Sequence, residues 1–142
     1  MIKALGTVTV HVANVEEAVE FYTEKLGLVK KTDQRLGKLR WVTVGPKDQE
    51  LPEIFLKNPQ DWYDKNTADR FMEIMGWTTT WVFRTDDCKG DYKKFKAKGV
   101  KFTQEPKEQP YGIEAVFVDP WDNPYALLER LDRQPRWEKV SD

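Results

Sequence analysis

The only histidine of the chain, His11, lies in a short run whose pattern places it beside hydroxyl groups. From Thr7 onward, polar residues alternate with valines, as expected of a β-strand with one apolar face. Thr7, Thr9 and His11 therefore share the polar face of the predicted strand. An imidazole there could act as a base, a metal ligand or a hydrogen-bond donor. A hydrogen-bonded histidine without a chemical role is the alternative interpretation.

Glu53 is the second residue that could do chemistry. It lies two positions before Phe55 in a strand-like run, so the two side chains should share the inward face. An inward carboxylate needs a partner, and Arg40, Arg84 or His11 could supply it. Without a partner, its pKa would rise and the group could serve as a general base. The alternative is a solvated carboxylate at the edge of a cleft.

Cys88 is the only cysteine, and it lies at the start of a predicted helix, where a thiol pKa could be lowered. No histidine partner is evident in the sequence, so no role is assigned to it. A lone cysteine excludes an internal disulfide and is typical of a reducing compartment. The sequence contains no glycine-rich phosphate loop, no Gly-x-Ser-x-Gly elbow and no Cys-x-x-Cys pair.

The elements that must position these residues occur twice along the chain. Asn14 is a predicted helix N-cap, and Asp86 or Asp87 is its counterpart in the second half. Gly27 should end the first helix, and Gly99 should end the second. Each helix follows a β-rich run and precedes further strand-like sequence. This repetition predicts a pseudo-symmetric fold of two modules, and such folds often hold a cleft between their halves.

The predicted elements divide the chain into module one (1–58), a connector (59–76), module two (77–131) and a polar C-terminal tail (132–142). The strands are expected at 7–12, 34–44, 51–57, 78–83, 102–104, 113–118 and 125–131, and the two main helices at 15–26 and 86–98. The connector contains a helical stretch at 69–75. It could be a plain linker, which we favour, or a lid beside the cleft.

The composition excludes several classes of protein. Charged residues make up 33% of the chain and the net charge is −1, which gives no electrostatic reason to expect nucleic acid as a partner. No apolar run approaches the roughly 20 residues that a membrane helix needs. The N-terminus lacks the apolar core of a signal peptide. We therefore expect a cytoplasmic protein that binds neither nucleic acid nor membrane.

Tryptophan is abundant, with six among 142 residues. Packing in the core or in an interface is the simpler explanation. The alternative is a ligand pocket with aromatic walls, because tryptophan offers a large and rigid contact area. Trp41, Phe55, Trp77 and Trp121 are the candidates for such walls, whereas Trp81 should point toward the helix side of its strand.

Three stretches together resemble one family. They are residues 15–28 (VEEAVEFYTEKLGL), 40–44 (RWVTV) and 111–120 (YGIEAVFVDP). The sequence is similar over nearly its whole length to the vicinal oxygen chelate superfamily, which includes glyoxalase I, extradiol dioxygenases and the fosfomycin- and bleomycin-resistance proteins. The resemblance implies an α+β fold in which two βαβββ modules form a curled eight-stranded mixed sheet around a cleft. It also implies a homodimer.

Metal-using members of this family place ligands on the first and last strands of each module. The resemblance carries these positions onto Thr7, Glu53, Thr80 and Ala126, of which only Glu53 is a common ligand. An iron site of two histidines and one carboxylate needs two imidazoles, and a catalytic zinc needs about three protein ligands. Glu129 cannot replace Ala126, because an odd offset along a strand places it on the opposite face. We therefore expect neither a metal nor another cofactor.

The sequence thus favours a metal-independent protein that binds a small aromatic or antibiotic-like ligand. The resemblance supports this, because some relatives stack flat aromatic antibiotics between aromatic side chains. The candidate cleft residues are Thr7, Thr9, His11, Trp41, Glu53, Phe55, Thr80, Val82 and Ala126. One alternative is a lyase or dioxygenase that uses Glu53, with or without His11, to hold Zn, Ni, Mn or Fe. A second alternative is a degenerate, dimeric interaction module, and no catalytic residue is assigned.

Overall fold

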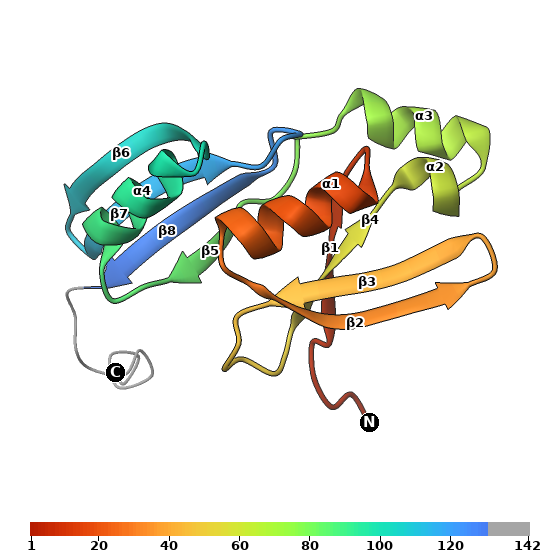
Figure 1. The fold of residues 1–142 in the computed structure, drawn as a ribbon, viewed down its shortest axis with the longest axis horizontal. Coiled ribbons are helices and arrows are strands. Elements are labelled where there is room, and N and C mark those ends of the chain that lie inside the picture. The colour runs from red at the N-terminus through yellow and green to blue at the C-terminus, as the bar shows by residue number, and fades with distance from the viewer. Residues whose placement is uncertain (131–142) are drawn as a thin grey trace. The chain divides into compact units, whose positions relative to one another are not determined.

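Eight strands and five helical segments follow one another in the computed structural model, which describes residues 1–130 (Figure 1). They are β1 (Thr7–His11), α1 (Val15–Glu20), the π-helical η1 (Phe21–Lys25), β2 (Val29–Leu36), β3 (Leu39–Gly45), β4 (Glu53–Lys57), α2 (Pro59–Trp62), α3 (Lys65–Glu73), β5 (Trp81–Arg84), α4 (Cys88–Ala97), β6 (Lys101–Gln109), β7 (Gly112–Val118) and β8 (Pro124–Arg130). The predicted tail, 132–142, lies outside the described residues. No helix of the described part is long and apolar enough to cross a membrane.

The strands form two mixed sheets with the same internal order. The first sheet runs β1-β4-β3-β2 and the second β5-β8-β7-β6, with a parallel pair (β1/β4 and β5/β8) followed by antiparallel neighbours. The α+β class and the two βαβββ modules are therefore confirmed, with the eight strands divided between two four-stranded sheets. The chain forms two compact units. The first is Met1–Thr79 with Asp119–Asn123, and the second, within the described residues, is Thr80–Val118 with 124–130.

The first helix begins and ends at the residues that the sequence predicts. The backbone N–H of Glu17 donates to the Asn14 side chain at 2.9 Å, which is the expected N-cap bond. The helix continues through η1 and ends at Gly27, whose φ of 75° is the left-handed conformation that glycine adopts without strain. Its apolar side buries Ala18 and Tyr22 completely. The valines of β1 and β3 supply the opposite half of this core.

The second helix is capped by Asp87 rather than Asp86. The backbone N–H of Gly90 donates to the Asp87 carboxylate at 3.0 Å. The helix ends at Gly99, which has a φ of 91°. α4 contacts β6, β7 and β8 of its own sheet, and Phe117 lies fully buried there.

The predicted strand at 34–44 is wrong, because this segment is a hairpin of two strands. β2 extends from Val29 to Leu36, and β3 begins at Leu39 after a turn at Gly37 and Lys38. Gly37 has a φ of 64°, which a two-residue hairpin turn requires. The turn signal in the sequence is a single glycine between apolar residues, and it is weaker than the usual Asn-Gly pair.

The predicted strand at 102–104 is too short. β6 extends over Lys101–Gln109 and contains Pro106, with register irregularities on both sides of Gln104. A proline cannot donate a hydrogen bond to a neighbouring strand, so strands containing one are usually placed at the edge of a sheet. β6 is the edge strand of the second sheet, which is why it tolerates the proline.

A buried polar network ties the turn at residues 119–123 to the first helix and first strand. Asp119, only 2% exposed, accepts hydrogen bonds from the Tyr22 hydroxyl at 2.7 Å and from the Asn123 side chain at 2.8 Å. The backbone N–H groups of Trp121 and Asn123 each donate to its other oxygen at 2.9 Å. The Asn123 side chain also donates to the carbonyl of His11 at 2.8 Å. Asp119, at the end of the stretch 111–120 that carries the family resemblance, therefore has a structural role together with Asn123.

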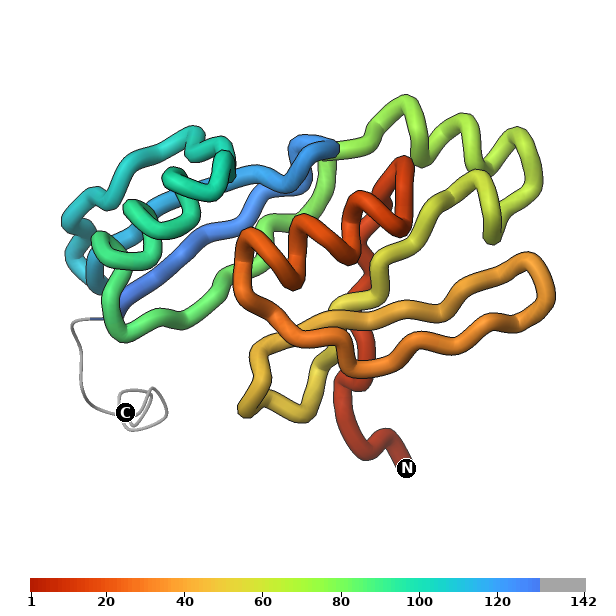
Figure 2. The backbone as a smooth tube through the Cα atoms, in the orientation of Figure 1, coloured from red at the N-terminus to blue at the C-terminus, as the bar shows by residue number. Residues whose placement is uncertain are grey.

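The connector is more than a plain linker, which corrects the interpretation favoured from the sequence. Figure 2 follows the chain from β4 through α2 and α3. Trp62 of α2 packs edge-on against Phe55 of β4, and Phe71 of α3 lies against His11 of β1. The connector therefore contributes side chains to a surface of the first sheet.

Candidate functional site

One face of the first sheet collects most of the predicted site residues. In the parallel pair β1/β4, Thr7 lies opposite Glu53, Thr9 opposite Phe55, and His11 opposite Lys57. The other face of these strands is apolar, and Val10, Ile54 and Leu56 are buried there. We call the surface formed by Trp41, Phe55, Trp62, Tyr63 and Phe71, together with His11 and Lys57, the aromatic face.

Three rings from three different elements form one end of the aromatic face. Trp41 of β3 stacks on Phe55 of β4 with ring centroids 4.0 Å apart and planes 26° apart. Trp62 of α2 meets both rings edge-on, at 6.3 Å from Trp41 and 5.5 Å from Phe55. Trp41 and Trp62 remain partly accessible, whereas Phe55 is 3% exposed. The buried phenyl ring therefore supports two tryptophans that stand nearer the solvent.

His11 belongs to the other end of the aromatic face. Its ring lies 4.4 Å from that of Phe71, and its Nε2 atom is 3.5 Å from the Tyr63 hydroxyl. Tyr63 in turn stacks on Phe71 at 4.9 Å. Burial, and secondarily the positive charge of Lys57, lowers the pKa of His11 below its usual 6.5. The imidazole is therefore neutral at pH 7 and acts here as a stacking and hydrogen-bonding group.

Because burial lowers the pKa of His11 in the folded state, protonation of this residue favours the unfolded chain. Its contribution to stability is therefore complete above the unfolded pKa of 6.5 and falls as the pH drops through the lower, folded value. We expect the free energy of unfolding, measured in urea, to decrease less between pH 7 and pH 5 in His11→Gln than in the wild type. Since the chain has one histidine, its imidazole proton signal can be titrated directly by NMR. A midpoint at or above 6.5 would contradict the prediction.

Glu53 finds partners other than those predicted. Its carboxylate accepts hydrogen bonds from the hydroxyls of Thr43 and, at 3.2 Å, Thr32. Within residues 1–130, neither Arg40 nor His11 forms a hydrogen bond or ion pair with it, so these two predicted partners are wrong. His11 is four residues along β1 from Thr7, the register partner of Glu53, a separation of about 13 Å. Glu53 and His11 therefore cannot share a metal ion, as the lyase or dioxygenase alternative with both residues requires.

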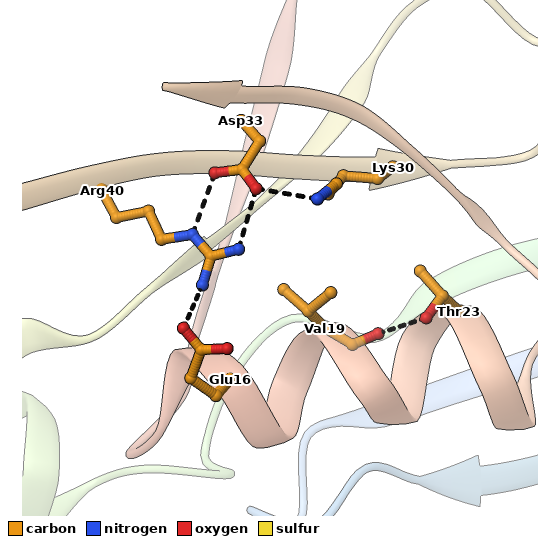
Figure 3. A network of polar contacts seen from close by, with 6 residues as sticks. All are labelled: Glu16, Val19, Thr23, Lys30, Asp33 and Arg40. Carbon is orange, nitrogen blue, oxygen red and sulfur yellow. Dashed lines mark hydrogen bonds and ion pairs between the residues drawn. The ribbon is translucent and has the colours of Figure 1, made fainter. Parts of the chain in front are cut away.

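Figure 3 shows the Arg40 guanidinium directed toward Asp33 and Glu16. Trp41 is the next residue along β3, so the alternation of the strand places it on the opposite face. The Arg40 guanidinium donates two hydrogen bonds to Asp33, at 2.9 and 2.8 Å, and pairs with Glu16 of α1. These bonds, together with one from Lys30, hold the pKa of Asp33 well below its usual range. Arg40 thus joins β2 and β3 to the helix side and is unavailable to the aromatic face.

The second unit places the remaining candidates along β5 and β8. Val82 lies opposite Ala126 in register and is 54% exposed, whereas Ala126 is 5% exposed. Thr80 precedes β5 and has no register partner there. The side chains of Val82, Arg84, Tyr111, Leu128 and Arg130 line a cavity of about 430 Å³.

Glu129 lies on the face of β8 opposite Ala126, as its odd offset predicts. Its carboxylate accepts a hydrogen bond at 2.9 Å from the backbone N–H of Cys88 at the start of α4. The Cys88 thiol is buried and lies 3.4 Å from the carbonyl of Leu127. Burial, reinforced by the nearby Glu129 charge, raises the pKa of this thiol, so the lowering considered from its helix position is wrong. Cys88 is a packing residue.

Sequence reasoning missed four members of the aromatic face: Lys57, Trp62, Tyr63 and Phe71. The period of two along β4 is a signal for Lys57, because it lies two positions after Phe55. The aromatic pair Trp62-Tyr63 is a signal for the connector, since solvent-exposed linkers rarely carry such residues. Conversely, the predicted wall residues Trp77 and Trp121 make no ring contact with the aromatic face in the described part of the chain, and Trp77 is 85% exposed.

Comparison with known proteins identifies the family. A family model of the Glyoxalase/Bleomycin resistance protein/Dioxygenase superfamily matches residues 4–127. The protein YurT of Bacillus subtilis (strain 168) is 35% identical over 123 residues, which cover 86% of this chain and 95% of YurT. The crystal structure of UcmS2 matches with a TM-score of 0.83 at 36% identity, covering 90% of this chain and 98% of UcmS2.

A further solved structure combines the fold with a stated binding role. TnmS3, an antibiotic binding protein from Streptomyces sp. CB03234, matches with a TM-score of 0.75 at 28% identity. The match covers 91% of this chain and 97% of TnmS3. With two βαβββ modules and a family match over most of its length, the chain belongs to the glyoxalase/bleomycin resistance protein/dioxygenase superfamily.

Proposed function

We propose that the protein binds a small planar aromatic compound on the aromatic face and that it does so without a metal ion. The observation that carries this proposal is the contact of Trp41 and Trp62 with the buried ring of Phe55. Rings held in place by packing lose little conformational freedom when a ligand binds. Each aromatic contact with a flat ligand contributes about 0.5–1.5 kcal/mol beyond the apolar area that it buries.

The donor set does not fit a resident metal. Of the four positions that the family uses, Ala126 has no donor atom in its side chain, and neutral threonine hydroxyls at Thr7 and Thr80 are weak ligands. The carboxylate of Glu53 already accepts hydrogen bonds from the hydroxyl groups of Thr32 and Thr43. Within residues 1–130, no group of three or more histidine, cysteine or acidic side chains is arranged to hold a metal. A lyase or dioxygenase reaction therefore has no support in this set of side chains.

The relatives support the same class of function. TnmS3 is an antibiotic binding protein, and it is 28% identical to this chain in a match that covers 91% of this chain. An aromatic binding surface and a donor set unsuited to metal are what a binding protein of this family needs. We therefore favour a ligand-binding role over an enzymatic one.

The proposal is tested by tryptophan fluorescence and calorimetry with a panel of planar polycyclic aromatic compounds. At least one compound should quench the fluorescence saturably, and the affinity should be unchanged after treatment with EDTA. Trp41→Ala should lower that affinity at least about tenfold, equivalent to about 1.4 kcal/mol, because it removes an accessible ring of the site. Trp77→Ala is the matched control, since Trp77 is 85% exposed and lies outside the aromatic face.

Three results would count against the proposal. One is the absence of saturable binding across the panel. Another is an equal loss of affinity in Trp41→Ala and Trp77→Ala. The third is a loss of binding on EDTA treatment that added Zn²⁺, Ni²⁺, Mn²⁺ or Fe²⁺ restores. Thermal unfolding of each variant, followed by circular dichroism, separates a lost contact from a lost fold.

A further inference from the structure

Lys57 places a positive charge in the middle of the aromatic face. Its Nζ atom lies 4.2 Å from the centroid of the Tyr63 ring, 5.6 Å from that of Trp62 and 5.9 Å from that of Phe55. Because β4 exposes alternate residues on the same face, Lys57 projects beside Phe55 rather than toward the helix side. Three ring faces thus surround one ammonium group.

In the described part of the chain, no acidic side chain forms an ion pair with Lys57. Within residues 1–130, the ion pairs join Lys30, Arg40 and Lys65 to their partners, and none includes Lys57. The acidic residue nearest in β4 is Glu53, and its carboxylate is bonded to threonine hydroxyls. Ring faces attract an ammonium through their quadrupole, but they carry no net charge to offset it. An anion that reaches Nζ would therefore form a charge-assisted hydrogen bond without displacing an internal partner.

Two neutral polar groups lie beside this charge. The Tyr63 hydroxyl and the Nε2 atom of His11 are 3.5 Å apart, and both residues belong to the aromatic face. His11 is half-buried, and Lys57 acts on it electrostatically. A carboxylate bound to the Lys57 Nζ atom would have the Tyr63 hydroxyl nearby as a donor. Its second oxygen could therefore also accept a hydrogen bond.

We propose that the ligand is an aromatic acid, with its ring system against Trp41 and Trp62 and its ionised carboxylate on the ammonium of Lys57. This inference rests on the proposed function, because it assigns a chemical class to the ligand of the same surface. The aromatic rings recognise the flat part of the molecule, and Lys57 selects an anion over a neutral compound of the same shape.

The test uses two probes with the same ring system and nearly the same shape, the anion 2-naphthoate and the neutral 2-naphthamide. At pH 7.5, the wild type should bind the carboxylate at least about tenfold more tightly than the amide, a difference of about 1.4 kcal/mol. Lys57→Met keeps an apolar stem of similar length and should reduce the preference for the carboxylate over the amide to within about twofold. Lys47→Met, which changes an exposed lysine in the turn between β3 and β4, should retain the full preference.

The NMR signal of the single histidine provides an independent reading of where the anion binds. A carboxylate on Lys57 offsets the charge that acts on His11, so 2-naphthoate should raise the pKa of His11, whereas 2-naphthamide should not raise it by that mechanism. Equal affinities for the two probes, or a preference that survives Lys57→Met, would overturn this inference and leave the proposed function intact. Failure of both probes to bind the wild type would overturn this inference, and the proposed function would fail with it only if the whole panel of planar aromatic compounds also failed to bind.

Discussion

Asp119→Ala should lower the free energy of unfolding by about 3–5 kcal/mol, because it removes a buried carboxylate that accepts hydrogen bonds from four donors. The Tyr22 hydroxyl and the Asn123 side chain lie in the interior and would each lose an acceptor. An unsatisfied buried polar group costs about 1–3 kcal/mol, and partial entry of water limits the total. Urea unfolding, followed by fluorescence and circular dichroism, measures the loss.

Two variants separate the contributions within this network. Tyr22→Phe removes one donor and leaves the carboxylate with its other three hydrogen bonds, so it should cost only about 1 kcal/mol. Asp122→Asn is the matched control. Asp122 is exposed in the same turn, and asparagine tolerates its φ of 66°. A loss below about 1 kcal/mol in Asp119→Ala would show that the network contributes little.

Asp119 also makes the free energy of unfolding depend on pH in a predictable direction. Burial raises the pKa of Asp119 above its usual value, although its hydrogen bonds to Asn123 and Tyr22 oppose the shift. Protonation therefore favours the folded state, and this contribution is complete below the unfolded pKa of 3.8 and lost as the pH rises through the folded value. Asp119→Asn cannot titrate. The stability advantage of the wild type over Asp119→Asn should accordingly be larger at pH 3 than at pH 7.

Phe117→Ala should destabilise the second unit by about 3–5 kcal/mol. The Phe117 side chain is fully buried on β7, and its ring lies within 5.4 Å of Tyr125 and 5.6 Å of Phe102 by centroid. It also contacts Phe95 from α4, so its removal leaves a cavity between helix and sheet. A cavity of this kind costs both the transfer free energy of the ring and its lost packing contacts. Thermal and urea unfolding would measure the effect.

Phe102→Ala is the comparison for this prediction. Phe102 touches Phe117 and Tyr92, but it lies on the edge strand β6 and is only half-buried. Its removal should therefore cost about half as much as that of Phe117. Equal costs for the two variants would show that the second core is not centred on Phe117.

The helix boundaries follow from the sequence because each depends on local chemistry. Asn14 binds the N–H of a residue three positions on, and Gly27 adopts the left-handed conformation that other residues avoid. Neither interaction needs the rest of the chain. The hairpin at Gly37 depends on a tertiary interaction instead. The segment divides into β2 and β3 because the two strands pair with each other across a two-residue turn, and no strong local signal marks that turn.

The candidate site could be predicted where it follows strand periodicity and could not where it depends on tertiary packing. His11 and Phe55 share a face because each strand alternates, and the register of β1 with β4 brings those faces together. Glu53 lies two positions before Phe55 on the same strand, but its threonine partners come from strands whose register no local signal sets. Trp62 and Phe71 reach the sheet only because the connector folds back over it.

The first unit is interrupted in sequence, since its final residues, Asp119–Asn123, follow three strands and the helix of the second unit and precede β8. Proteins emerge from the ribosome N-terminus first, and domains commonly fold as they appear. A nascent chain that has reached Thr79 holds every strand and helix of the first unit but lacks the carboxylate that Tyr22 requires. The two halves of this duplicated sequence are therefore unequal during synthesis: the earlier half is completed only after the later one has largely been translated.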